Sequence, residues 1–138
     1  MMAPAHSHWA ACEIGQPWVA GSSDCWSFAR RIWVERFGWD VPPVPVDPRD
    51  PRESRRALAE PPEDQGWVQV TKPAEGDAVL MARGAYPAHV GIWIEPDLGG
   101  ILHSIEVAGV VFTAPDRLAG LGYRIIGFYR RTVEGQGS

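Results

Sequence analysis

The sequence predicts an α+β fold in which helices come first and an antiparallel sheet follows. Between Cys25 and Phe37 the apolar residues recur close to the i, i+3, i+4, i+7 spacing of a helix with one buried stripe. From Trp67 onward, short runs of alternating apolar and polar residues are separated by glycine and proline, which is typical of strands joined by hairpins. Helices followed by strands, without a repeating strand, helix, strand order, favour an α+β over an α/β fold.

The residues at the ends of the expected elements support this order. A first short helix is expected over 6–14, ending at Gly15. The second starts at Cys25, with Asp24 as the N-cap residue that accepts hydrogen bonds from free N–H groups, and it stops at Gly38. Strands are expected over 67–70, 76–81, 89–94, 101–107, 110–113 and 123–130, with a short helix over 115–121.

The chain has the size of one domain. With 138 residues, 45% of them hydrophobic, it is long enough to bury one core and too short for two comfortable ones. We therefore expect a single domain over 1–138. Prolines concentrate in residues 41–62, which we expect to form an extended surface excursion, and we expect a flexible tail over 132–138.

Charge and hydropathy exclude several classes of function. The net charge is −4 and no long basic run occurs, so the sequence carries no nucleic-acid footprint. No apolar run reaches the roughly 18 residues of a membrane span, and the N-terminus lacks the basic and apolar regions of a signal peptide. We expect no nucleic-acid partner, no membrane insertion and no export by an N-terminal signal.

A metal site is a weaker hypothesis for the first segment. His6, His8 and Cys12 are candidate ligands, because His and Cys four residues apart share a helix face. A structural zinc site takes four ligands and this neighbourhood supplies three at most, so the alternative is an exposed helix start. We expect no metal and no cofactor. Two cysteines, Cys12 and Cys25, are too few for a disulfide framework.

Cys25 is the candidate nucleophile. The unpaired N–H groups and the dipole of a helix start favour a thiolate over a thiol. The alternative is a cysteine that acts as a small apolar side chain in the core. His89 begins one expected strand and His103 lies on the next, which supplies a base for the thiol and a third group to orient that base. Each of the two can instead be a partly buried structural histidine.

The orienting group has more than one candidate. A hairpin that turns near Leu98 without a gap places His103 opposite Trp93 or the residue after it. That position is several residues from His89, although a strong twist of the strands can close the distance. Otherwise Glu106 or a backbone group takes the place of His103.

Several sequence blocks occur together in a recognisable order. They are Gly15-x-Pro17-Trp18, Asp24-Cys25-Trp26-Ser27-Phe28, Pro73-x-x-Gly76-Asp77-x-Val79-Leu80, His89-Val90-Gly91-Ile92-Trp93-Ile94 and Leu102-His103-Ser104. In this order they resemble the NlpC-type family of cell-wall cysteine peptidases. The segment 124–130 resembles the branch carried by tailed phages and gene transfer agents. The resemblance implies a papain-like fold, with N-terminal helices and the nucleophile helix packed on a small antiparallel sheet.

The resemblance also implies a reaction and a role for each site residue. Cys25 attacks a peptidoglycan stem peptide, usually at the bond between the γ-carboxyl of D-glutamate and diaminopimelic acid. His89 acts as the base and His103 as its orienting partner, and the backbone N–H of Cys25 helps to hold the oxyanion. Substrate contacts are implied at Trp18, Asp24 and Trp26.

Together with the lack of a signal peptide, the resemblance implies a protein made in the bacterial cytoplasm, incorporated into a phage-like tail and active in the periplasm or cell wall. Its partners are then the stem peptide and tail-tip or baseplate hub proteins. A cytoplasmic recycling enzyme is one alternative. Another is a catalytically idle tail-tip protein that uses its tryptophans as a contact surface, and a third is a related amidase that cuts the sugar-to-alanine link.

Overall fold

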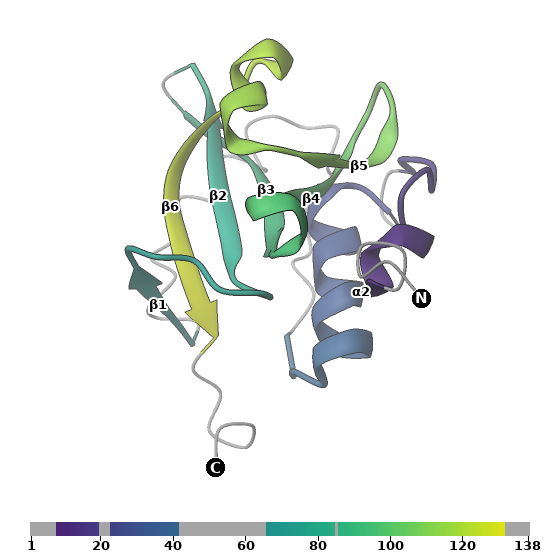
Figure 1. Ribbon diagram of the computed structural model, residues 1–138, viewed down its shortest axis with the longest axis vertical. Coiled ribbons are helices and arrows are strands. Elements are labelled where there is room, and N and C mark those ends of the chain that lie inside the picture. Colours follow the sequence, from purple (N-terminus) through teal and green to yellow (C-terminus); the bar gives the residue numbers. More distant parts are fainter. Residues whose placement is uncertain (1–7, 20–22, 42–65, 85, 132–138) are drawn as a thin grey trace.

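The computed structural model describes residues 8–19, 23–41, 66–84 and 86–131. A 3-10 turn, η1 (Trp9–Cys12), precedes the α-helix α2 (Cys25–Phe37) (Figure 1). The remaining elements are β1 (Trp67–Val70), β2 (Ala78–Arg83), β3 (Tyr86–Ile94), η3 (Pro96–Leu98), β4 (Gly100–Ile105), β5 (Gly109–Thr113), η4 (Pro115–Leu121) and β6 (Arg124–Arg131). The excursion predicted over 41–62, apart from Val41, and the tail predicted over 132–138 lie outside the described residues.

The strands form one six-stranded antiparallel sheet with the order β1-β6-β2-β3-β4-β5. Strands β2 to β5 are neighbours in sequence and in space, joined by short turns. The last strand, β6, lies between β1 and β2 (Figure 1). Each strand expected from alternation and turn residues is present, with ends displaced by a few residues.

The predicted fold class, a papain-like α+β domain with N-terminal helices on a small sheet, is wrong. Among the described residues α2 is the single α-helix, and the six-stranded sheet dominates the fold. The helix expected over 6–14 is reduced to the four-residue η1. The His8 side chain accepts from the backbone N–H of Ala10 and starts this turn, and Gly15 follows with a φ of +98°. So short a turn cannot propagate as a helix.

Helix α2 has the ends that the sequence predicts. The Asp24 side chain accepts from the backbone N–H of Ser27, and Gly38 closes the helix in the left-handed conformation with a φ of 71°. The residues that α2 buries most deeply are Phe28, Ala29, Ile32 and Trp33. They pack on the sheet face that carries Val90, Ile92, Ile94 and Leu102. No helix in the described ranges is long and apolar enough to span a membrane.

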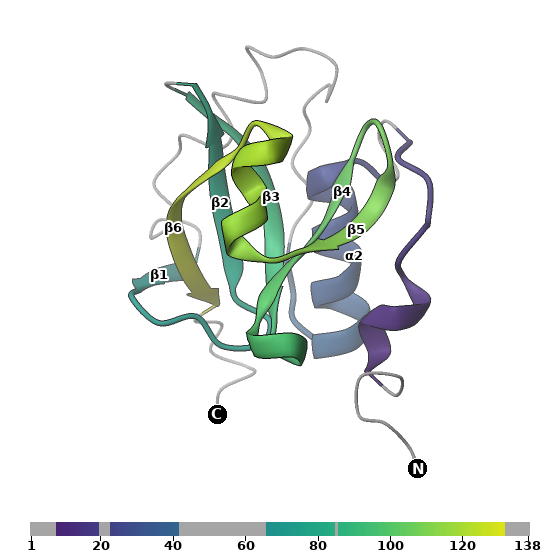
Figure 2. The same cartoon turned by 45° about the horizontal axis from the view of Figure 1, so that its top comes forward.

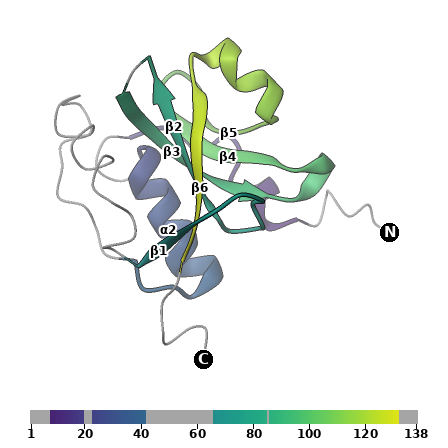
Figure 3. The ribbon, with the colours of Figure 1, turned by 90° about the vertical axis from the view of Figure 1, so that its left-hand side faces the viewer.

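The opposite face of the sheet has its own apolar cluster, formed by Val79, Met81, Ile101 and Leu118. Leu118 belongs to η4, so this short helix covers the face that α2 leaves open. Figure 3 shows α2 and η4 on opposite sides of the strands, and Figure 2 shows η4 lying over them. Both faces of the central strands are therefore covered.

The start of β2 is fixed by a buried carboxylate. Asp77 accepts from Arg130 of β6 at 3.0 and 2.8 Å and from the backbone N–H of Ala74 at 2.7 Å. Next to it, Trp33 Nε1 of α2 donates to the carbonyl of Gly76 at 2.8 Å. These contacts connect the helix, the loop before β2 and the last strand.

Replacing Asp77 with alanine should lower the free energy of unfolding by about 2–3 kcal/mol, because it removes the buried carboxylate to which Arg130 and the Ala74 N–H donate. Urea denaturation followed by tryptophan fluorescence measures the change. Asp116→Ala, the same substitution at an exposed position of η4, is the control and should shift stability by less than about 0.5 kcal/mol. Equal stability of the Asp77 variant and the wild type contradicts this role.

Candidate active site

Two contacts hold the start of α2 against the sheet. Ser104 Oγ of β4 donates to the carbonyl of Ser23 at 2.6 Å. Val90 of β3 makes a backbone hydrogen bond to Cys25, the first residue of α2. Because Val90 directly follows His89 in the chain, the Cys25 thiol lies beside the strand at the residue after His89.

A series of hydrogen-bonded side chains crosses β3, β4 and β5. His89 Nε2 lies 2.7 Å from His103 Nδ1, and His103 Nε2 lies 2.9 Å from Thr113 Oγ1. The exposed fractions are 3% for His89, 0% for His103 and 8% for Thr113. We call these three residues the imidazole relay. Buried polar groups are costly unless hydrogen-bonded, and within the relay each ring finds a partner.

Gly91 allows the two rings to meet. Ile92 pairs with Leu102, and one step further along the ladder Gly91 faces His103. A Cβ atom added at Gly91 would lie 2.9 Å from the His103 Cβ. His103 therefore occupies the space over a residue without a side chain, and from there it reaches His89 diagonally.

The register expected from a hairpin turning near Leu98 is wrong. Trp93 pairs with Ile101 rather than with His103, because the turn between β3 and β4 is centred before Leu98, within η3. The alternative orienting group, Glu106, is exposed in the turn after β4. The structure therefore brings His103 into contact with His89, and the catalytic roles of Cys25, His89 and His103 stay predictions.

Two side chains near His89 were missed by sequence reasoning. Tyr123 stacks on His89 with ring centroids 4.4 Å apart and planes 14° apart. The Arg83 guanidinium lies 4.6 Å from the centroid of the Tyr123 ring. No local spacing rule links Arg83 or Tyr123 to His89, since the contacts join β2, β3 and the segment before β6.

Burial controls the protonation of the site. Burial lowers the pKa of His89 well below its usual value, and the nearby charges of His103 and Arg83 lower it further. Burial also lowers the pKa of His103 to about 4. At neutral pH both rings are uncharged.

The thiol of Cys25 is uncharged at neutral pH as well. Burial raises its pKa to about 11; the backbone hydrogen bond from Val90 opposes this rise, whereas the charge of Asp24 adds to it. The N–H groups of the helix start also lower the pKa, as the sequence predicts, but burial outweighs them. The expected thiolate is therefore not the resting form.

The three residues with implied substrate contacts lie close to the start of α2. Trp18 is half-buried and directly precedes Val19, whose carbonyl accepts from the backbone N–H of Ser23 at 2.8 Å. Asp24 is buried, and its side chain caps the helix. Trp26 packs edge-on against Trp33, with centroids 5.7 Å apart. Asp24 and Trp26 thus have structural contacts, and substrate contacts at all three stay predictions.

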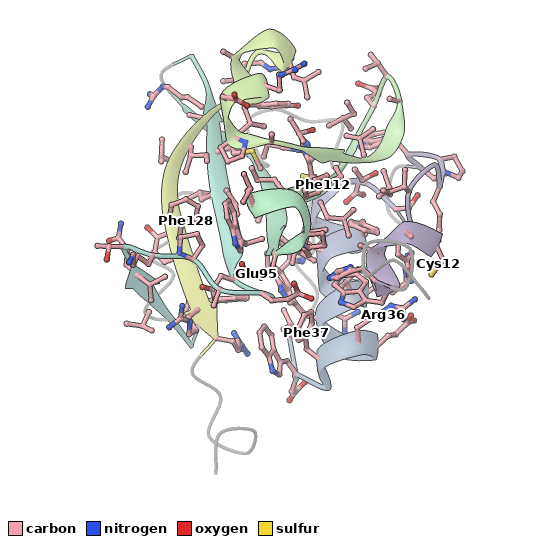
Figure 4. All side chains as sticks on the ribbon, viewed as in Figure 1. Cys12, Arg36, Phe37, Glu95, Phe112 and Phe128 are labelled. Carbon is pink, nitrogen blue, oxygen red and sulfur yellow. The ribbon has the colours of Figure 1, made fainter. Side chains whose placement is uncertain are left out.

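The candidate metal ligands near the N-terminus have other partners. His8 Nε2 lies 2.8 Å from Glu75 Oε2. Cys12 Sγ accepts from Arg36 at 3.2 Å, and Figure 4 labels Cys12 and Arg36. His6 lies outside the described residues. Within the described ranges no group of three or more His, Cys, Asp or Glu side chains is placed to hold a metal ion. Cys12 and Cys25 are both free thiols.

Comparisons with known proteins do not identify the family or the function of this chain. Neither models of known protein families nor the curated proteins give a match to this chain. The resemblance of its sequence blocks to the NlpC-type family therefore stays a prediction. The chemistry of the site has to be argued from the residues and distances described above.

Alkylation of Cys25 by iodoacetamide should speed up about tenfold for each pH unit from about pH 7 to about pH 10, because the thiolate fraction rises in that proportion below the thiol pKa. The rate is measured by mass spectrometry of the Cys25 peptide, with Cys12→Ala removing the second thiol. A rate that is already constant between about pH 6 and about pH 8 contradicts a neutral resting thiol.

Gly91→Ala should lower the free energy of unfolding by about 1–3 kcal/mol, because the added methyl group overlaps His103 and Ile101. Gly120→Ala is the matched control, since a Cβ there has no atom within 4 Å. Chemical denaturation of both variants measures the difference. If the two variants are equally stable, close approach of His103 to Gly91 is not what the position requires.

Proposed function

We propose that this protein is a cysteine peptidase that hydrolyses peptidoglycan stem peptides, at the bond between the γ-carboxyl of D-glutamate and diaminopimelic acid. The observation that carries the proposal is the buried contact of 2.7 Å between His89 and His103, next in the chain to Val90, whose backbone bonds to Cys25 at the helix start. A nucleophile, a base and a group that orients the base are the parts that cysteine and serine hydrolases share.

The reaction would begin with transfer of the Cys25 proton to His89 as the sulfur attacks the carbonyl carbon. Backbone N–H groups at a helix start have no partner within the helix, and the N–H of Cys25 would stabilise the oxyanion of the tetrahedral intermediate. His89 would then give the proton to the leaving amine, which produces a thioester on Cys25. Water, activated by His89, would hydrolyse the thioester and restore the thiol.

A neutral resting site is compatible with this sequence of steps. Burial disfavours both a thiolate and an imidazolium, so the proton moves during the attack instead of beforehand. Once His89 is charged, it keeps the hydrogen bond to His103, and the face of the Tyr123 ring lies 4.4 Å away. Both contacts favour the charged ring.

The relay favours an enzyme over an idle tail-tip protein. Burying two imidazoles costs free energy that an apolar pair of similar size would not cost. A protein that only docks to neighbours has no chemical need for this pair. We extend the proposal to a phage-like tail or gene transfer agent, with tail-tip or baseplate hub proteins as partners, on the resemblance of the segment 124–130.

Digestion of purified peptidoglycan tests the proposal. Wild-type protein should release fragments cut after γ-D-glutamate, identified by mass spectrometry, and Cys25→Ala and Cys25→Ser should release about a thousandfold less, because the nucleophile is absent. Cys12→Ala is the matched control and should keep full activity, since Cys12 is an exposed thiol near Arg36, away from the relay.

The products separate the proposal from its alternatives. Fragments cut between the sugar and L-alanine would assign the protein as an amidase. No release by folded wild-type protein, alone and together with tail-tip proteins, would overturn the peptidase proposal and favour the idle structural protein.

A further inference from the structure

We propose that Thr113 is a positioning residue that fixes where the protons of the imidazole relay lie, so that His89 presents an unprotonated nitrogen to Cys25. The inference deepens the proposed function and rests on it for its catalytic meaning. It stands on the hydrogen-bond series in which His103 Nε2 lies 2.9 Å from Thr113 Oγ1 and His103 Nδ1 lies 2.7 Å from His89 Nε2.

Neutral relay rings can arrange their protons in two ways. In the first, His89 Nε2–H donates to His103 Nδ1, and His103 Nε2–H donates to the hydroxyl oxygen of Thr113. In the second, every donor is reversed: the Thr113 hydroxyl donates to His103 Nε2, and His103 Nδ1–H donates to His89 Nε2. A neutral imidazole has one donor and one acceptor nitrogen, so the choice at His103 determines the choice at His89.

Only the first arrangement can accept a proton from Cys25. It leaves His89 Nδ1 as a bare acceptor, whereas the second arrangement places a proton on that nitrogen. When His89 becomes an imidazolium it must donate through Nε2, and His103 must then be the acceptor at Nδ1. The proton of His103 has to lie on Nε2, and in the described part of the chain its acceptor is Thr113.

Because the relay is buried, the Thr113 hydroxyl determines which nitrogen of His103 carries the proton. His103 has no exposed surface and Thr113 is 8% exposed, so bulk water does not replace the hydroxyl. Without it, a proton on His103 Nε2 would be a buried donor with no acceptor, which is among the costliest polar defects in a protein. A bare Nε2 is the cheaper choice, and it forces the second arrangement.

The geometry of the sheet explains why this threonine reaches the ring. His103 pairs with Val111 and Thr113 pairs with Ile101, so His103 and Thr113 are diagonal neighbours on one face of β4 and β5. Thr113 caps no helix, since Ala114 is the N-cap residue of η4 and makes no side-chain cap bond. Its hydroxyl is therefore directed to the relay.

The direct test is nitrogen-15 NMR of the histidine rings at neutral pH, which identifies the protonated nitrogen. Wild-type protein and Thr113→Ser should show a protonated Nε2 and a bare Nδ1 at His103. Thr113→Val, which keeps the shape and removes the hydroxyl, should move the proton of His103 to Nδ1. Thr71→Val, the same change at an exposed position, is the control and should resemble the wild type.

A second readout links the tautomer to reactivity. Thr113→Val should slow peptide cleavage near neutral pH by roughly ten- to a hundredfold, because a general base is worth about that much or more. KM should change little, and Thr113→Ser should restore most of the rate. The charged and titratable groups that act on His89, or on the Tyr123 ring stacked on it, are the same in all variants; they are Cys25, Arg83, His103 and Glu106.

Two results would overturn the inference. One is a wild-type His103 with its proton on Nδ1, which is decisive even if Thr113→Val does not fold. The other is a folded Thr113→Val protein in which His103 keeps its proton on Nε2. NMR needs no substrate, so the absence of peptidoglycan cleavage would reject the proposed function and leave this proton arrangement to be judged separately.

Discussion

Docking of the start of α2 on β3 and β4 is the constraint on which the whole candidate site depends. Val90 and Ser104 hold the helix start, and each directly follows a histidine of the relay, His89 and His103. Because each docking residue is next to a histidine in the chain, the strand positions that fix the helix start also place the two imidazoles. A slip of one residue in either strand would exchange these roles.

Burial is the second determinant of the chemistry. It holds the thiol and both imidazoles in their uncharged forms and outweighs the favourable helix start at Cys25. The relay tolerates this environment because its hydrogen bonds are satisfied from inside the protein. A base that rests uncharged is ready to accept a proton, and its hydrogen-bond partner is in place when the charge forms.

The secondary structure and the ends of α2 could be predicted from local sequence patterns. Turn residues and alternation identified the six strands, and Asp24 and Gly38 were recognised as the caps of α2. The fold class was wrong because the segment 6–14, expected to form a helix, contributes only the four-residue turn η1, which leaves α2 as the single α-helix of the described residues. The histidines were named in advance, but their contact depends on Gly91, whose importance emerges only when two strands are paired.

The remaining features come from contacts between distant residues. Thr113, Tyr123 and Ser104 belong to the site through the pairing of strands, and no spacing in the sequence marks them. The raised pKa of Cys25 likewise depends on how deeply the helix start is buried, whereas the helix-start effect is visible locally.

The central claim is that Cys25 is a nucleophile served by His89. The most direct measurement is rapid acid quenching of the protein with a γ-D-glutamyl stem peptide, followed by tandem mass spectrometry of the trapped chain. The claim predicts an acyl group on Cys25, which is absent from Cys25→Ala and strongly reduced in His89→Ala. Cleavage of the peptide without an adduct on Cys25, or with an adduct on Cys12, would contradict it.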